Sequence, residues 1–243
     1  MTTVDFNIEF DLLYNNALSN SAPEINIYEK SIFLTQAQEE IIKEAYDNKN
    51  KKDFFESSEA IRKRLEELCI TKVSSYNSGL NATLSALKLS TNSKFFAIES
   101  DVWYITYERC ATSTKQLYIV PTALDQYSML EDNPFKKPNK DRAWRFNLAN
   151  TISTDKIVEI VSDQTLTTYL YRYLREPAPI ILDDLDTVFP GQDLSINGIN
   201  TKTECALNSE VHRIILKRAV ELATVAYKDN TLQNNIQLNN RNN

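Results

Sequence analysis

Glycine and histidine are scarce in this chain of 243 residues, which contains three glycines and one histidine. A globular chain of this length would contain about seventeen glycines at the usual frequency of roughly 7%. Loops that wrap a phosphate group or strain a catalytic nucleophile depend on clustered glycines, because these accept positive φ angles. Gly79, Gly191 and Gly198 are not clustered, and only His212 offers a side chain that titrates near neutral pH. The composition therefore favours a protein that works through shape and contacts, without catalysis, bound metal or cofactor.

Surplus positive charge, paired cysteines and long apolar runs are also missing. The formal net charge of −6 argues against a nucleic-acid-binding surface, because neutralising phosphates requires an excess of Lys and Arg. Cys69, Cys110 and Cys205 are odd in number and lack CxxC spacing, which predicts three reduced thiols in a protein made in a cytoplasm. Apolar stretches extend over only a few residues, and the start of the chain lacks the basic region of a signal peptide. We therefore expect no membrane-spanning segment and no secretion signal.

Apolar residues at three- and four-residue steps predict helices at both ends of the chain. Thr35 and Gln38 have the spacing of a capping box at the start of the second helix. Asn208 or Ser209 is the expected cap of the last helix, which should end near Lys228. The helices are expected at residues 5–20, 36–48, roughly 58–68 and 209–228.

The middle of the chain has a different pattern, with short runs rich in aromatic and β-branched residues between polar or turn clusters. This pattern predicts a mostly antiparallel sheet or a small barrel. A short helix is expected at 122–130, after Pro121. The predicted strands are 94–100, 103–110, 116–120, 144–148, 156–162 and 167–174.

These patterns together predict an α+β fold, in which a bundle of the N-terminal helices and the long C-terminal helix carries a β-rich insertion and a flexible C-terminal tail. The final fifteen residues include seven asparagines, and we expect them to be disordered until a partner orders them. Leu232, Ile236 and Leu238 are the candidate docking residues of this tail. The expected parts are an N-terminal helical part at 1–70, the β-rich insertion at 71–205, the C-terminal helix at 206–228 and the tail at 229–243.

Two charged clusters are candidate contact sites. The basic cluster contains prolines and asparagines, which favours a solvated loop that pairs with an acidic neighbouring subunit. The interleaved Trp144 and Phe146 leave nucleic-acid binding open as an alternative. The acidic cluster could hold a divalent cation, but without EF-hand spacing it is interpreted as a solvated turn. The clusters consist of Lys136, Lys137, Lys140, Arg142 and Arg145, and of Asp183, Asp184 and Asp186.

Three stretches of the chain together resemble structural proteins of crAss-like, short-tailed bacteriophages. The first is EFDLLYNNALSNSAPEINIYEKSIFLTQAQEEIIKEAY, the second is YLYRYLREPAPIIL, and the third is TECALNSEVHRIILKRAVELA. They cover about a third of the chain. In that order they are similar to the head–tail connector adaptor, or ring, proteins of these phages.

The resemblance implies a virion protein without catalytic residues, made in the cytoplasm of the host bacterium. It implies a ring of identical subunits, twelve in number, that joins the portal to the next tail ring protein and surrounds the channel of the viral DNA without binding it specifically. Two alternatives stay open: another tail or baseplate ring component, and a phage-encoded module that binds nucleic acid or the host.

Overall fold

The computed structural model of the 243-residue chain describes residues 1–17, 24–47, 59–148 and 156–241, with the side chains of 60, 61 and 228–241 excepted. The described chain forms two compact units. The helical unit combines Met1–Leu68 with Pro177–Asn243, and the β unit is Cys69–Glu176. Among the described residues, no helix is both long and apolar enough to span a membrane.

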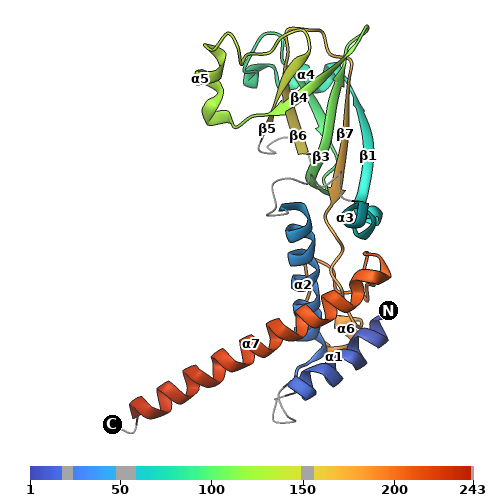
Figure 1. Ribbon diagram of the computed structural model, residues 1–243, viewed down its shortest axis with the longest axis vertical. Helices are drawn as coiled ribbons and strands as arrows, with labels where there is room; N and C mark the ends of the chain where they lie inside the picture. Colours follow the sequence, from blue (N-terminus) through green and yellow to red (C-terminus); the bar gives the residue numbers. More distant parts are fainter. Residues whose placement is uncertain (18–23, 48–58, 149–155, 242–243) are drawn as a thin grey trace. The chain divides into compact units, whose positions relative to one another are not determined.

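The helical unit is built on three long helices, of which α7 contacts both α1 and α2 (Figure 1). The inner side of α1 buries Phe6, Phe10 and Tyr14, and the Phe6 ring lies 5.4 Å from the ring of His212 on α7. The elements are α1 (Thr3–Ala17), α2 (Ile27–Asp47), α3 (Glu59–Arg64), the 3-10 turn η1 (Glu66–Leu68), α6 (Leu185–Val188) and α7 (Ser209–Arg241).

The start of α2 corrects one expectation from the sequence. Asn26 and Glu29 form a reciprocal capping box, in which each backbone N–H donates to the other's side chain, so α2 begins nine residues before the predicted start at Gln36. Thr35 is instead buried inside the helix, where its hydroxyl accepts a hydrogen bond of 3.0 Å from the backbone N–H of Ile180. The capping box expected at Thr35 is therefore wrong, because a tertiary contact uses that polar side chain.

Buried polar side chains of α2 hold the segment that returns from the β unit. Ser31 accepts from the backbone N–H of Leu182 at 3.1 Å, and Gln38 donates to the carbonyl of Ala178 at 2.9 Å. Together with Thr35, these groups satisfy the backbone of an extended segment that has few regular partners. The residues after Glu176 thus belong to the helical unit, although the predicted β-rich insertion extended to residue 205.

The β unit is a seven-stranded sheet with the strand order β1-β7-β3-β4-β5-β6-β2. All neighbouring pairs are antiparallel except β4 and β5, which are parallel. The connection between β4 and β5 contains the 3-10 turn η3 (Leu124–Gln126) and the helix α5 (Tyr127–Glu131). The helix α4 (Ser78–Thr83) and the 3-10 turn η2 (Ser85–Leu87) lie between β1 and β2. The strands are β1 (Cys69–Ser75), β2 (Lys94–Ile98), β3 (Val102–Ala111), β4 (Gln116–Pro121), β5 (Arg142–Leu148), β6 (Lys156–Val161) and β7 (Thr168–Arg175).

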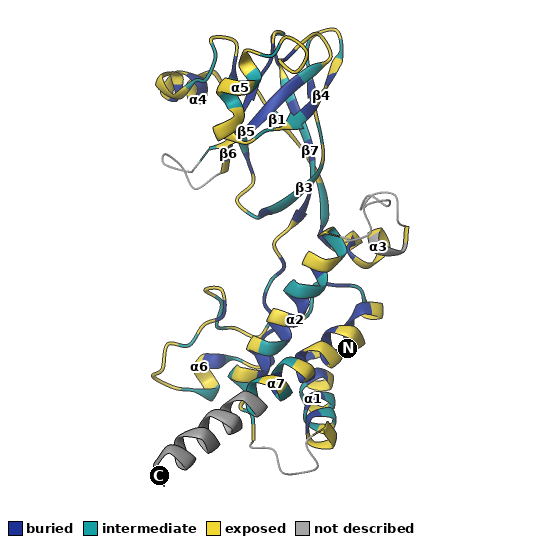
Figure 2. Ribbon diagram, turned by 60° about the vertical axis from the view of Figure 1, so that its left-hand side comes forward, coloured by how far each residue is buried: buried dark blue, intermediate teal, exposed yellow. Residues whose placement is uncertain are grey.

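The sheet curls into a nearly closed barrel, whose edge strands β1 and β2 approach each other. An ion pair of 3.2 Å between Lys72 of β1 and Glu99, just after β2, spans the seam. Tyr169, Tyr171 and Tyr173 alternate along β7 and stack inside the barrel at centroid distances of 5.2 and 5.5 Å. Figure 2 shows that buried residues are concentrated on the strands, whereas α4 and α5 are mostly exposed.

The predicted fold class is wrong. The chain is a mixed α/β protein, about 41% helix and 26% strand, and its seven-stranded sheet forms a nearly closed barrel as a compact unit of its own, so the fold is not mainly a helical bundle that carries a small β-rich insertion. All six predicted strands are present, but β1 was missed because its residues are mostly exposed and carry no clear alternation of apolar side chains. The C-terminal helix also does not end near Lys228, since α7 continues to Arg241 through the segment expected to be a flexible tail.

Candidate interaction surfaces

The lysines of the basic cluster lie on the long connection between β4 and β5. Lys136, Lys137 and Lys140 are exposed, whereas Pro138 between them is buried. No acidic partner of these three lysines is found within the described residues. The structure thus leaves three ammonium groups on one connection available to another molecule.

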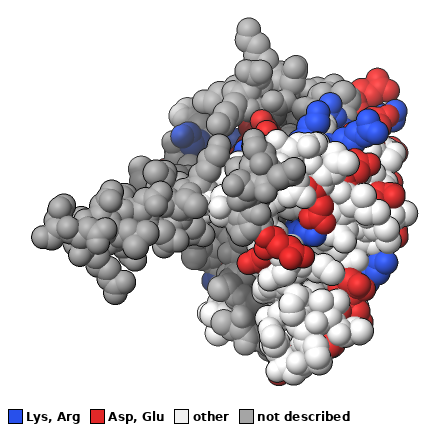
Figure 3. Space-filling model, turned by 90° about the horizontal axis from the view of Figure 1, so that it is seen from below, with Lys and Arg blue, Asp and Glu red and all other residues white. Residues whose placement is uncertain are grey.

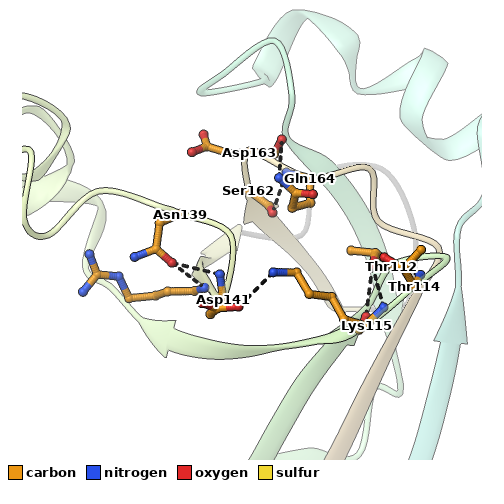
Figure 4. A network of polar contacts seen from close by, with 9 residues as sticks. Thr112, Thr114, Lys115, Asn139, Asp141, Ser162, Asp163 and Gln164 are labelled. Carbon is orange, nitrogen blue, oxygen red and sulfur yellow. Dashed lines mark hydrogen bonds and ion pairs between the residues drawn. The ribbon is translucent and has the colours of Figure 1, made fainter.

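Arg142 holds the shape of this connection. Its guanidinium donates hydrogen bonds of 2.7 Å to the carbonyls of Phe135 and Lys137. The side-chain oxygen of Asn139 accepts from the backbone N–H groups of Asp141 and Arg142, and Asp141 pairs with Lys115 at 2.8 Å (Figure 4). Arg142 and its neighbours therefore fix the lysine-bearing connection to the barrel.

Arg145, the last residue of the predicted basic cluster, is not on the surface. Its Nε lies 2.8 Å from Oε2 of Glu108 on β3, and the two side chains are only 10% and 7% exposed. The hydroxyl of Tyr169 donates to the same Glu108 oxygen at 2.8 Å, and the guanidinium also bonds Asn147. Arg145 belongs to a buried polar network of the barrel and is not available to a partner chain, which corrects its assignment from sequence.

The aromatic residues next to the basic cluster are also buried. Trp144 is 3% exposed and Phe146 is fully buried, and both pack edge-to-face with Tyr127 of α5. Stacking of unpaired bases requires exposed rings. These two aromatics therefore give no nucleic-acid-binding platform.

The acidic cluster is an exposed turn at the start of α6, as the sequence indicated. Asp184 caps the helix by accepting from the backbone N–H groups of Asp186 and Thr187 at 3.1 and 3.2 Å. Asp183 accepts from the N–H of Asp184, and Asp186 bonds the amide of Asn200. No group of three His, Cys, Asp or Glu side chains suited to a metal ion occurs in the described part of the chain.

Leu232, Ile236 and Leu238, the candidate docking residues, fall within the last part of α7. Their side chains lie outside the described residues. Their docking role stays a prediction.

Two exposed apolar side chains on the connection that carries the lysines were missed by the sequence analysis. Phe135 is 88% exposed and Met129 is 79% exposed, both on the connection between β4 and β5. Phe135 follows Asn133-Pro134, a pair typical of turns, and precedes two lysines. An aromatic residue inside a predicted turn was the sign in the sequence that could have identified this exposed ring. Exposed aromatic residues next to cations are common anchors of protein–protein interfaces.

The remaining candidate reactive groups are engaged in packing. His212 is 7% exposed, and its Nε2 bonds the carbonyl of Leu207 at 2.8 Å while Nδ1 lies 2.8 Å from the amino group of Met1. Burial lowers the pKa of His212, so the ring is neutral at pH 7. Burial likewise raises the pKa of the Cys205 thiol to about 11 and raises that of Cys110, and both sulfurs stay protonated.

Comparison with known proteins matches the sequence of the chain to a family. A family model described as phage tail ring protein 3/4 matches residues 1–235. The chain is 37% identical over 243 residues to ring protein 4/5 of Bacteroides phage crAss001, covering 99% of both chains. It is also 37% identical over 236 residues to ring protein 3 of the same phage, covering 93% of this chain and 96% of that protein. The resemblance found in the sequence is confirmed over nearly the full length, and the chain belongs to the phage tail ring protein 3/4 family, whose members are structural ring proteins of crAss-like phages.

Proposed function

We propose that copies of this chain close into a ring in the virion tail that connects the capsid portal with the next tail ring protein. The observation that carries the proposal is the match to two phage ring proteins along both units of the fold. Twelve copies is the ring size implied by the resemblance. The protein acts by self-association and stacking and catalyses no reaction.

A closed ring requires a heterologous interface, in which two different faces of one subunit meet around the rotation axis. The exposed Lys136, Lys137 and Lys140 can form one such face, and the acidic Asp183 and Asp186 the complementary one. Arg142 and Arg145 are omitted because their side chains stabilise the β unit. Reversing the charge of Lys136 and Lys137 to Glu should weaken ring closure at low ionic strength, and assembly that stays unchanged would count against this pairing.

The negative net charge suits a ring around the genome channel. A lumen rich in Lys and Arg would hold the phosphate backbone and slow ejection, whereas a formal charge of −6 gives no such retention. We therefore propose that viral DNA passes through without specific binding.

The last part of α7 is proposed to dock onto a neighbouring ring through Leu232, Ile236 and Leu238. These residues recur at four- and two-residue steps, and the first two have the spacing of one helix face. Helix docking onto an apolar groove is a common mode of recognition. Deleting residues 229–243 should leave a folded subunit that no longer joins its neighbour. Infectious particles assembled from the deletion variant would refute this role.

Electron microscopy of the purified chain, alone and mixed with the portal protein of its phage, tests the main proposal. Rings, or portals capped by rings, are the expected result. A chain that is absent from mature particles, or that stays monomeric with and without portal, would overturn it. Rings that bind another tail component but not the portal would favour a different level of the tail or baseplate. The nucleic-acid-binding alternative is less well supported, because the aromatic residues on which it depended, Trp144 and Phe146, are buried.

A further inference from the structure

Helix α1 carries apolar side chains on two opposite sides. Phe6, Phe10 and Tyr14 form the inner stripe, which is buried. Residues two apart lie on roughly opposite faces of a helix, and residues four apart lie on one face. Val4, Ile8 and Leu12 therefore form an outer stripe, and these side chains are 56%, 60% and 58% exposed.

The outer stripe differs from ordinary surface leucines. Single exposed apolar residues are normal in soluble proteins, but contiguous apolar surface marks a contact site. Three residues at four-residue spacing extend over about 12 Å of the helix at a rise of 1.5 Å per residue. This regular spacing is typical of the anchors of a helix that lies in a groove of another chain.

A groove of suitable character lies between α2 and α7 of the same unit. It has a volume of about 510 Å³, and Ile41 and Ile214 provide its apolar lining. Ile214 of α7 is 43% exposed. The groove thus offers two apolar contacts to a side-chain stripe.

The groove is lined by three acidic and two basic side chains, Glu40, Glu44, Glu221, Lys217 and Arg218, so the charge match to α1 concerns single unpaired groups and not the groove as a whole. Helix α1 carries three acidic residues and no Lys or Arg. The exposed face of α7 around Ile214 carries Arg213, Lys217 and Arg218. Glu40 and Glu221 neutralise Arg218 at 2.7 and 3.1 Å. Within the described ranges, Arg213 and Lys217 have no acidic partner, and on α1 Glu9 has no basic one.

Figure 3 gives a broader view of the charge distribution on one face of the molecule. Neutral side chains cover much of the described surface, with acidic side chains scattered across it and most basic ones near one edge. Such a surface favours contact between neutral areas with a few charge pairs at the margin. A general electrostatic attraction to an anionic partner does not fit it.

We propose that the outer stripe of α1 in one copy lies in the α2–α7 groove of the next copy. Val4, Ile8 and Leu12 would contact Ile41 and Ile214, while Glu9 approaches Lys217. The occupant is a second copy of this chain because the chain belongs to a family of ring proteins, and because the unpaired Glu9 beside the stripe and the unpaired Lys217 of the groove have opposite signs. The proposal rests on ring formation and names the faces that meet.

The contact has the asymmetry that a ring needs. The stripe and the groove are different surfaces of one subunit, so each copy can offer one to each neighbour. A stable interface buries about 800 Å² on each partner, more than three side chains supply. The stripe is thus the central anchor of a larger interface, where substitutions have their largest effects.

The variant Ile8→Glu tests the anchor in the full-length chain. It places a carboxylate in the centre of the proposed apolar contact, where it would be buried without a partner. We expect the concentration required for half-maximal assembly, measured by sedimentation velocity, to rise roughly tenfold or more. Thr201→Glu is the control, since it adds the same charge at an exposed position of the helical unit outside the stripe and groove. Circular dichroism checks that both variants stay folded.

A charge exchange tests whether the stripe meets this groove. Glu9→Lys and Lys217→Glu should each weaken assembly a few-fold, and the double variant should recover the wild-type value, because the pair is restored with reversed signs. Weakening by Ile8→Glu without recovery in the double variant would place a different surface against the stripe and overturn the proposal. Rings that form equally well with Ile8→Glu overturn it while leaving ring formation intact. A wild-type chain that stays monomeric at every concentration overturns both.

Discussion

The buried pair between Arg145 and Glu108 allows one prediction to be worked out in detail. Replacing Arg145 by Met keeps most of the side-chain volume but removes the charge 2.8 Å from the Glu108 carboxylate. Leaving one partner of a buried ion pair without the other costs about 3–5 kcal/mol. Tyr169 continues to donate to Glu108, so we expect the lower end, about 3 kcal/mol.

That loss should be visible as a large change in melting temperature. For a domain of about 100 residues, each kcal/mol lowers the midpoint by roughly 4 °C or more, so Arg145→Met should melt about 12 °C below wild type. Both tryptophans of the chain, Trp103 and Trp144, lie in the β unit. Tryptophan fluorescence therefore reports the unfolding of the β unit separately from that of the helical unit. A separate probe is needed because a chain with two units need not unfold in a single two-state transition.

Two further variants separate the ion pair from general effects of the substitution. Arg109→Met makes the same change on β3 at an exposed position and should stay within about 0.5 kcal/mol of wild type. Arg145→Met combined with Glu108→Gln removes the unpaired charge but keeps an acceptor for Tyr169, and should recover at least about half of the loss. An Arg145→Met variant less than about 1 kcal/mol below wild type would refute the reasoning, as would a double variant no more stable than the single one.

Three other changes give distinct expected results. Burial raises the pKa of Glu159, whose carboxylate accepts from the backbone N–H of Leu89 at 2.8 Å, so the folded state favours the protonated acid and loses stability as pH rises through this raised pKa. Glu159→Gln keeps the acceptor without the charge, and its thermal stability relative to wild type should increase between pH 4.5 and 7.5; a difference independent of pH would contradict this. Burial lowers the pKa of His212 below its usual 6.5, so wild type should lose stability as pH falls below about 6.5 because the unfolded chain binds the proton more readily. In His212→Gln that loss should be absent from melting curves followed by circular dichroism at 222 nm, and equal pH slopes in both proteins would show that another group is responsible. Phe135→Ser should leave the melting temperature of the β unit unchanged, since the ring is 88% exposed, and a drop of several degrees would mean that the ring packs in the folded protein.

The family, and the helices and strands that local residue patterns specify, could be predicted from the sequence. The start of α7 followed from its cap at Asn208, whose side chain accepts from the N–H of Glu210. Short aromatic and β-branched runs located all strands except β1. Stretches at both ends of the chain and at the end of β7 carried the resemblance to ring proteins, which the comparisons confirm.

The tertiary structure decided which polar residues are exposed to solvent and which are buried in the core. Arg145 lies five residues after the exposed Lys140 and was assigned to the same basic cluster, yet the strand order brings Glu108 of β3 within 2.8 Å of it. Thr35 has the local pattern of a helix cap, but the return of the chain at Ile180 places it in the core.

Residue types and their spacing therefore determined most of the secondary structure and the family, because these depend on local geometry and composition. The near closure of the barrel, the burial of Arg145 and the exposure of Val4, Ile8 and Leu12 depend on contacts between segments that are distant in sequence, in one case 211 residues apart, about which the local sequence carries no information.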